Sequence, residues 1–292
     1  MAEGSVVQED DQPRSQSAQQ SKSPCLDNPV YKEISIANGK VNRMENFQVK
    51  RCLDELGLDS RGVGKVLKKR LKNHLKKEKL ALAKLEQEKR IKQVHFYCVI
   101  DFEGTCEEEN PKDYIHEIIE FPVVLVDANT LEVVSEFHEF CKPQLKPTLS
   151  QFCQDLTGVT QETVDKADPF PIVLSKFEQW LADHELGTKY TFGVVTDGPW
   201  DISRFFLIQC NLCLIPVPKY ARKWINLRKL YRNFYKTQGG TLQDMVNNLG
   251  MTFEGRPHSG MDDARNIARI LQQMVQDGCE ITFNEHLERK KT

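Results

Sequence analysis

Two carboxylates stand two residues apart at the end of an apolar run, in the segment Ile100-Asp101-Phe102-Glu103. Side chains of a strand alternate between its faces, so Asp101 and Glu103 would project to the same side. Two acidic groups held this close repel each other unless a cation or a proton lies between them. Hard divalent ions prefer oxygen ligands, and Mg²⁺ leaves coordination positions open for phosphate. The pair indicates a divalent-metal site, with two unrelated strand-end acids as the alternative.

The helical phase of two downstream segments selects further carboxylates. In a predicted helix at 260–276, Asp263 falls on the apolar stripe Ile267, Ile270 and Met274, whereas Asp262 falls on the polar face with Asn266, Arg269 and Gln273. In a predicted helix at 200–212, Asp201 falls in phase with Phe205, Ile208 and Leu212. Burial of a carboxylate is costly unless a metal or a donor satisfies it. Asp197 precedes Gly198-Pro199 and is a reserve candidate, since a turn or capping role also explains it.

His258 lies five residues before Asp263, in the loop that enters the last helix. A histidine that titrates near neutrality beside metal carboxylates can take a proton from an attacking water. A structural role is the usual one for a lone loop histidine, and the fixed offset from Asp263 favours the catalytic role.

The elements that must position these residues follow from the hydrophobic pattern. Strands are predicted at 96–103, 118–126, 133–141, 190–195 and 224–227, and helices at 171–183, 200–212, 241–249 and 260–276. Three strands in succession, followed by alternating strands and helices, predict an α/β fold with a mixed sheet flanked by helices.

The charge is unevenly distributed, although the net charge is only −2. Residues 41–93 carry sixteen Lys and Arg against seven Asp and Glu, and residues 94–292 carry twenty against twenty-nine. A short helix is predicted at 47–56, capped by Gly57, and a second carries the apolar stripe Val63, Leu67, Leu71 and Leu75. The basic side chains on its other faces indicate a nucleic-acid surface or, alternatively, a solvated helix face: Arg61, Lys65, Lys68, Lys69, Lys72 and Lys76.

Several protein classes are disfavoured. The acidic N-terminus has no apolar signal region, and no stretch approaches the roughly 20 apolar residues of a membrane span. Nine scattered cysteines suit a reduced cytoplasmic or nuclear protein better than a disulfide framework. The lone pair Cys210 and Cys213 lacks the partners of a zinc site, so both are interpreted as buried helix residues.

Three segments resemble the motifs of the DEDDh family of exonucleases: DFEGT at 101–105, Trp200-Asp201, and HSGMDD at 258–263. The similarity runs through most of residues 95–285 and includes 116–122, 156–158 and 255–258. Gly104 departs from the alanine common in that family. The basic segment resembles a SAP module, a two-helix nucleic-acid-binding unit, in Val49, Leu53, Gly57-Leu58, Gly62, Leu67 and Arg70-Leu71. Val63 and Gly64 follow that glycine, where SAP modules often have lysine.

The resemblance implies an RNase-H-like fold, with a SAP-like module at 41–77 and an exonuclease domain at 95–285. Composition predicts a disordered tail at 1–40 and a helical linker at 78–94, and a tail at 286–292 follows the exonuclease domain. The resemblance implies two Mg²⁺ ions, with Mn²⁺ able to substitute, held by Asp101, Glu103, Asp201 and Asp263, with Glu103 and His258 as the catalytic residues and His258 as the general base. The implied nucleotide contacts are Phe102, Glu103, Gly104, Phe152, Leu156, Thr157, Trp200, Ile202 and His258, where hydrophobic core is the ordinary reading of the apolar members.

The implied function is 3′→5′ trimming of RNA with a structured 3′ end, with release of nucleoside 5′-monophosphates. Within the family, an architecture with a SAP module implies histone mRNA stem-loops, 5.8S ribosomal RNA and small interfering RNA as substrates. It also implies a stem-loop-binding protein and ribosomal subunits as partners, and a cytoplasmic, nuclear and nucleolar location. A DNA exonuclease would use the same five residues, and a non-catalytic RNA-binding adaptor is the second alternative.

Overall fold

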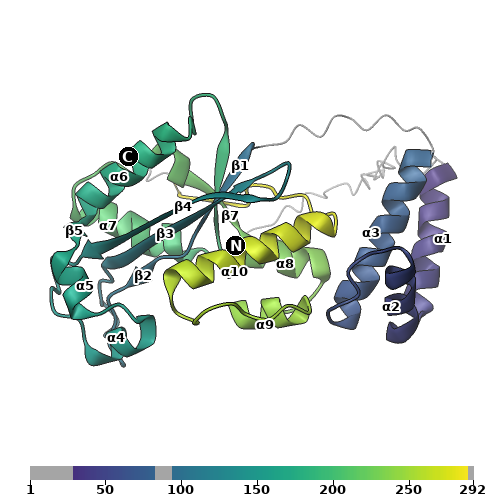
Figure 1. The fold of residues 1–292 in the computed structure, drawn as a ribbon, viewed down its shortest axis with the longest axis horizontal. Helices are drawn as coiled ribbons and strands as arrows, with labels where there is room; N and C mark the ends of the chain where they lie inside the picture. The colour runs from purple at the N-terminus through teal and green to yellow at the C-terminus, as the bar shows by residue number, and fades with distance from the viewer. Residues whose placement is uncertain (1–28, 83–93, 289–292) are drawn as a thin grey trace, which may run out of the picture.

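The computed structural model describes residues 29–82 and 94–288, which form an N-terminal module (29–82) and a sheet domain (94–288). Figure 1 shows the helices of the module standing at one end of the sheet domain, beside the C-terminal end of α10 (Gly260–Gln276). No helix among these residues is long and apolar enough to cross a membrane.

The sheet domain is built on a mixed sheet, as predicted. Its strands lie in the order β5 (Asp168–Pro169), β4 (Val133–Lys142), β3 (Ile118–Asp127), β1 (Phe96–Ile100), β6 (Phe192–Thr196), β7 (Lys223–Asn226) and β8 (Glu285–His286), and β2 (Glu103–Gly104) pairs with β3. The strands β1, β3 and β4 are antiparallel neighbours, whereas β6 and β7 continue parallel to β1. The carboxyl ends of β1 and β6 therefore meet at one edge of the sheet. Because the two strands run in the same direction, the loops that follow them lie close together.

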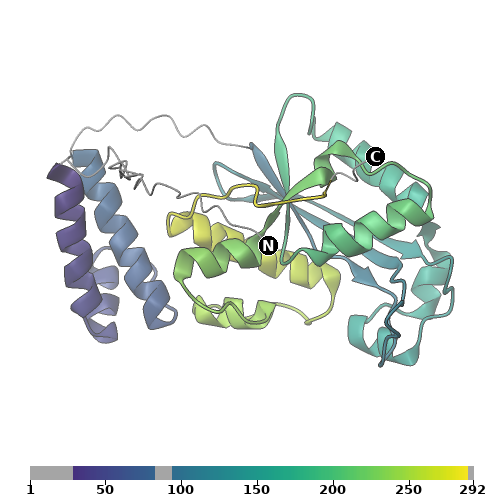
Figure 2. The same ribbon diagram turned by 180° about the vertical axis from the view of Figure 1, so that it is seen from behind.

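Helices cover both faces of this sheet (Figures 1 and 2). One face carries α8 (Leu227–Tyr235), α9 (Leu242–Asn248) and α10, and the other carries α6 (Phe170–Asp183) and α7 (Leu207–Leu212). Alternate residues of β1 serve the two layers: Tyr97 and Val99 pack with the α10 side, Cys98 and Ile100 with the α6 side. This alternation directs the side chain after Ile100 back toward α10.

Two predicted elements are corrected by the structure. The strand predicted at 96–103 ends at Ile100 and resumes as β2, with a register shift between Glu103 and Gly104. The helix predicted at 200–212 begins as a π-helix, η1 (Asp201–Phe206), so the phase assumed for an α-helix is wrong. Its buried apolar residues are Ile202, Phe206 and Cys210 instead of Phe205, Ile208 and Leu212, because each π-turn takes one extra residue.

Several short elements were missing from the prediction. They are α4 (Gln151–Thr157), α5 (Gln161–Lys166), the 3₁₀ turn η2 (Lys219–Arg222), α8, β5 and β8. The helices α4 and α5 have only two turns each, which is too short for a hydrophobic period to appear in sequence. The strand β8 also moves the end of the domain past the predicted boundary, since His286 pairs with Lys223.

The N-terminal module contains three helices, α1 (Pro29–Arg43), α2 (Asn46–Glu55) and α3 (Gly64–Leu82). The tail predicted at 1–40 is therefore wrong for residues 29–40, whose low apolar content hid a helix that packs on α3 through Ile34 and Val41. Val49, Leu53, Leu67 and Leu71 form the core of the module as predicted. Val63 lies before α3 and is exposed, so it does not belong to the stripe. The linker is helical to Leu82, and residues 83–93, like residues 1–28, lie outside the described residues.

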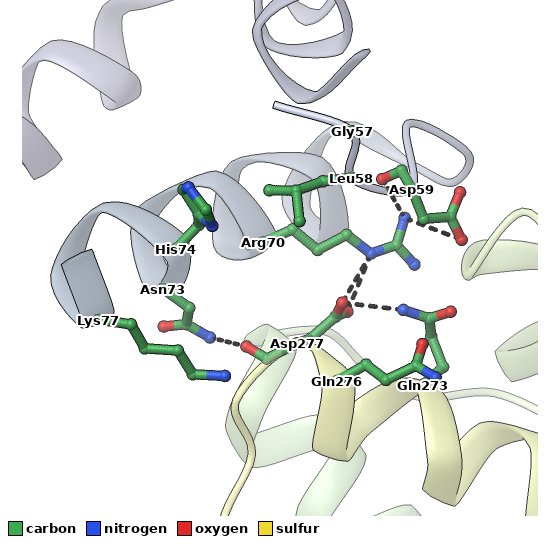
Figure 3. Close-up of a pocket in the computed structure, with 10 residues that line it drawn as sticks. All are labelled: Gly57, Leu58, Asp59, Arg70, Asn73, His74, Lys77, Gln273, Gln276 and Asp277. Atoms are coloured by element: carbon green, nitrogen blue, oxygen red, sulfur yellow. Dashed lines mark hydrogen bonds and ion pairs between the residues drawn. The ribbon is translucent and has the colours of Figure 1, made fainter. Parts of the chain in front are cut away.

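A buried ion pair joins the module to the sheet domain (Figure 3). Arg70 of α3 donates to the carboxylate of Asp277, which follows α10, at 2.8 Å, and only 3% and 4% of the two side chains is exposed. The same carboxylate accepts hydrogen bonds from Tyr235 and Gln273. A cavity of about 350 Å³ lies beside the pair, lined by Asn73, His74 and Lys77 from α3 among others.

Close backbone contact completes this junction. Gly62 and Gly250 face each other with positive φ angles of 113° and 78°. A Cβ on Gly250 would lie 2.3 Å from the nitrogen of Gly62, so no other residue fits there. Val66 of α3 belongs to the hydrophobic core of the sheet domain. The module is thus packed against the domain and not merely tethered to it.

Candidate active site

Three carboxylates meet at the edge of the sheet where β1 ends. Asp101, Glu103 and Asp263 each offer an oxygen, and these oxygens lie within 4.8 Å of one another. Among the described residues this is the one group of three or more acidic, histidine or cysteine side chains with such spacing. The two residues from the β1–β2 segment and the one from α10 are brought together although they are 160 positions apart in sequence.

The fourth carboxylate, Asp201, comes from the π-helix that follows β6. Its Oδ1 accepts a hydrogen bond from the backbone N–H of Phe102 at 3.0 Å, which places it against the β1–β2 segment. Asp197, the reserve candidate, instead forms an ion pair with Arg228 and has a partner of its own. Three of the four predicted acids therefore share one cluster, Asp201 lies against the segment that carries two of them, and Asp197 is paired with Arg228.

Burial raises the pKa of all four acids, and the charges of neighbouring carboxylates raise it further. Burial raises the pKa of Asp263 to about 7 and that of Asp201 to about 7. Burial, followed by the charge of Glu120, raises the pKa of Glu103 to about 9. The pKa of Asp101 is raised by burial and then by the charges of Asp201, Asp263 and Glu103. Four anions in one place require positive charge, which divalent cations supply.

One oxygen of the cluster fits a metal ligand in particular. The Oδ1 atom of Asp263 is buried and has no hydrogen-bond partner among the described residues, whereas its Oδ2 accepts from the backbone N–H of His258 at 3.0 Å. An unsatisfied buried carboxylate oxygen is costly unless a cation binds it. The donor set consists of carboxylate oxygens alone, which suits hard divalent ions.

His258 is exposed and lies in the loop that enters α10. Its φ angle is 63°, a left-handed conformation that a residue with a Cβ seldom adopts, and the N–H bond to Asp263 holds the backbone there. The residue is exposed to solvent, and its backbone is bonded to one acid of the cluster. This arrangement allows proton transfer to or from a group bound at the cluster.

Two large apolar side chains are exposed near the site. Trp200, directly before Asp201, is 58% exposed, and Phe152 of α4 is 38% exposed. The serine N-cap of α4 connects this helix to the segment that follows β2, because the Ser150 hydroxyl donates to the carbonyl of Cys106 at 2.7 Å. Exposed aromatic rings beside a phosphate-directed site can stack on nucleobases. Leu156 of α4 is half-buried.

The other predicted nucleotide contacts lie in the interior. Phe102 packs on Phe121 and Phe206, Ile202 is 1% exposed, and Thr157 hydrogen-bonds within α4. Their side chains are buried in this structure, and their contact with nucleotide stays a prediction. Gly104 is also buried, and a Cβ there would approach the Phe205 ring to 3.2 Å, so the departure from alanine accompanies a bulky neighbour.

The helix phase of α10 is partly corrected. Ile267, Ile270 and Met274 are buried with Asp263 as predicted. Asn266 and Gln273, predicted on a polar face, are buried as well because α10 lies between the sheet, α8 and α9. Asn266 is satisfied by the backbone of Glu254 and Asp262.

The predicted basic surface of the module is only partly open. Arg61 is exposed and pairs with Asp59, and Lys76 is exposed. Lys68 and Lys72 donate to Asn42 at the end of α1. Lys65 donates to the carbonyl of Lys236, and Lys69 lies over the ring of Phe234 at 4.5 Å from its centroid.

The sequence reasoning missed the role of Arg70. A signal was present, because Val66, Arg70, Asn73 and Lys77 follow helical spacing on a second face of α3. The surrounding block of basic residues concealed it. Cys210 is buried and Cys213 half-buried, and both are free thiols; neither belongs to a metal-ligand group in the described part of the chain.

Comparison with known proteins agrees with this geometry. Residues 98–271 match the RNase T exonuclease family. Over 261 residues the chain is 51% identical to 3′-5′ exoribonuclease 1 of Mus musculus, covering 89% of this chain and 75% of the mouse protein.

Two solved structures extend the comparison. The nuclease domain of 3′hExo, a DEDDh family member bound to rAMP, is 51% identical and covers 67% of this chain and 98% of its own, with a TM-score of 0.65. A structure of 3′-end specific recognition of a histone mRNA stem-loop by a 3′-exonuclease is 49% identical and covers 90% of this chain and 91% of its own, with a TM-score of 0.67. The chain therefore belongs to the RNase T family of exonucleases and, within it, to the 3′–5′ exoribonucleases of the DEDDh type.

Proposed function

We propose that this exoribonuclease uses Mg²⁺ to trim the single-stranded 3′ end of stem-loop RNA of the histone mRNA kind. The observation that carries the proposal is the carboxylate cluster with the unsatisfied Oδ1 of Asp263. Asp101, Glu103, Asp201 and Asp263 would hold the ions. When bound, divalent ions neutralise these acids and stabilise negative charge that develops at the phosphodiester.

The side chains of the protein supply the remaining steps. Trp200 and Phe152 would stack on bases near the 3′ end, a contact that needs no particular sequence. The exposed His258 would accept a proton from the attacking water as the water oxygen bonds to the phosphorus. The bond between the phosphorus and the 3′ oxygen of the preceding residue would break, that oxygen would take a proton from solvent, and the terminal residue would leave as a nucleoside 5′-monophosphate. The RNA kind is proposed from the similar 3′-exonuclease whose structure concerns a histone mRNA stem-loop. The exposed Arg61 and Lys76 of the module would contact the phosphates of such a stem.

Digestion of an end-labelled stem-loop RNA tests the proposal. We expect shortening from the 3′ end in Mg²⁺, similar shortening in Mn²⁺, none with chelator, and a stop near the base of the stem. Asp101→Asn and Asp263→Asn should abolish cleavage and keep RNA affinity within about threefold. Equal rates on a DNA strand of the same sequence would contradict the RNA preference, and wild-type turnover in either variant would contradict the metal site.

A further inference from the structure

A buried glutamate connects the two halves of the carboxylate cluster. Glu120 lies in β3 as the register partner of Glu103, and it is 3% exposed. Its Oε2 accepts from the backbone N–H of Gly260 at 3.1 Å, and its Oε1 accepts from that of Met261 at 3.2 Å. Those two residues begin α10. One side chain thus ties the strand ladder that holds Glu103 to the helix that carries Asp263.

The start of α10 depends on this glutamate for its hydrogen bonds. The first N–H groups of a helix have no partner inside the helix, and a residue at the N-cap usually satisfies them. The N-cap residue of α10, Ser259, makes no side-chain capping bond. Glu120, from strand β3, accepts these hydrogen bonds in place of Ser259. Its negative charge also interacts favourably with the positive end of the helix dipole.

The start of α10 packs so closely on the backbone of Asp101 that a shift of one would displace the other. A Cβ on Gly260 would lie 2.7 Å from the carbonyl oxygen of Asp101, so the helix start rests directly on the backbone of that acid. Next to Gly260, the strained backbone of His258 is held by its bond to Asp263. A shift of the helix start would therefore move the general base and one acid of the cluster together.

A histidine fixes the glutamate in turn. The Nε2 atom of His138 on β4 lies 2.8 Å from Oε1 of Glu120, and the imidazole packs beside Phe140. The carboxylate thus has three partners from two elements, and these contacts fix the orientation of the Glu120 side chain.

We infer that Glu120 is a positioning residue for hydrolysis, which aligns Asp263 and His258 with the β1–β2 acids by anchoring the first turn of α10. It acts through the backbone of Gly260 and Met261 and contacts no substrate. A displacement of reacting groups by about 1 Å can cost about 100-fold in rate, which sets the scale of the expected effect.

The chain offers a matched control in Glu117, just before β3. This residue is 1% exposed, and its carboxylate accepts from the backbone N–H groups of Gln144, Leu145 and Lys146 at 2.7 to 2.9 Å. It has the same chemistry and burial but anchors a loop that carries none of the site residues.

The experiment compares Glu120→Gln with Glu117→Gln in the full-length protein. Glutamine keeps the size of the side chain but replaces one acceptor oxygen by an NH₂ donor. At position 120 this donor would face the N–H groups of α10, to which it cannot hydrogen-bond. We expect Glu120→Gln to lower kcat by about 10- to 100-fold with KM changed less than threefold, and to raise the Mg²⁺ concentration for half-maximal rate several-fold. Glu117→Gln should keep kcat within about threefold of the wild-type value, even if its Tm falls as much as that of Glu120→Gln.

Hydrogen exchange provides a readout that does not depend on activity. Amides at 260–263 should lose protection in Glu120→Gln, and amides at 144–146 in Glu117→Gln. His138→Gln, which retains a donor, should lie between wild type and Glu120→Gln. The inference is overturned if Glu120→Gln keeps wild-type kcat and Mg²⁺ dependence, or if Glu117→Gln loses rate to the same extent at equal folded fraction.

Discussion

At the scale of single residues, the pKa values of the acids connect the site to the stability of the metal-free protein. The pKa of Asp263 rises from 3.8 to about 7 on folding, chiefly through burial. The folded state therefore retains a proton that the unfolded chain releases above pH ~4. The contribution of this group to the free energy of unfolding is fully present below that pH and is lost as the pH rises through about 7. The total loss is on the order of 4 kcal/mol.

We predict that the chelated wild-type enzyme loses stability between pH 5 and pH 8, measured by denaturant unfolding. Asp263→Asn should flatten part of this dependence, and Mg²⁺ should restore the wild type at pH 8 because it replaces the protons. A flat profile for both proteins in chelator would show that the acids do not interact as the structure indicates.

The proton-transfer role of His258 gives a second residue-scale prediction. His258→Ala should reduce the rate by roughly 10²- to 10⁴-fold, the usual contribution of a general base. The rate should recover in part at high pH, where hydroxide replaces the base. The measurement is a pH–rate profile with a short oligonucleotide, and an unchanged profile with undiminished rate would leave His258 a structural residue.

The two aspartates near η1 can be separated by substitution. Asp201 hydrogen-bonds the segment that carries the other acids, and Asp197 is paired with Arg228. Asp201→Asn should therefore abolish turnover, whereas Asp197→Asn should retain at least a tenth of it and mainly lower Tm. Comparison of single-turnover rates at saturating Mg²⁺ decides the ranking, and the reverse order would place Asp197 in the metal site.

At the scale of elements, α4 shows how a cap positions a contact surface. The Ser150 hydroxyl accepts from the N–H of Cys153 at 3.0 Å and donates to the segment after β2, so it holds the helix of Phe152 in place. Ser150→Ala should cost about 1 kcal/mol of stability. We expect KM for a short RNA to rise several-fold with kcat nearly unchanged.

A second cap supplies the control for this test. Thr160 caps α5 through its bond with the N–H of Thr163 at 3.2 Å, in a helix without predicted contacts to nucleotide. Thr160→Ala should cost a similar stability and leave KM unchanged. If both substitutions raise KM equally, the effect reports general loosening and not the position of α4.

At the scale of the whole molecule, α10 spans the distance between the two functional regions. Its first turn carries Asp263, and Asp277 just beyond its last residue holds Arg70 of the module. Seventeen residues of helix measure about 25 Å, so the module is fixed at that separation from the acids. A rigid separation raises the effective concentration of one binding surface at the other.

We predict that breaking the Arg70–Asp277 pair weakens stem-loop binding but not the cleavage of short RNA. Arg70→Met or Asp277→Met alone leaves a buried charge unpaired, which costs about 3–5 kcal/mol, whereas the double substitution should be less harmful than either single one. Stem-loop affinity should fall at least tenfold in the single variants, while turnover of a short single-stranded RNA stays within threefold. Arg51→Ala, which removes an exposed ion pair with Glu55 inside the module, is the control and should change neither. Equal loss on both substrates would mean that the junction supports the active site itself.

The sequence by itself determined the long elements and the identity of the site residues. The predicted limits of the last helix, Gly260 and Gln276, agree with the structure, because its apolar period runs over several turns. The segment Asp101–Glu103 was recognisable because the motif is local and its spacing follows from the alternation of a strand. The burial of Asp263 also followed from helical phase alone.

Only the tertiary structure decided what depends on contacts between distant segments. The π-turns of η1 changed the buried face after Asp201, and no local pattern signals an extra residue in a helical turn. The helix α1 is too polar to be detected in sequence, and it is buried only where α3 covers it. The partners of Arg70 and Glu120 lie 207 and about 140 positions away, respectively. Sequence shows that a charge is present, but the fold decides whether that charge faces water or joins two elements, because burial is a property of the packed chain.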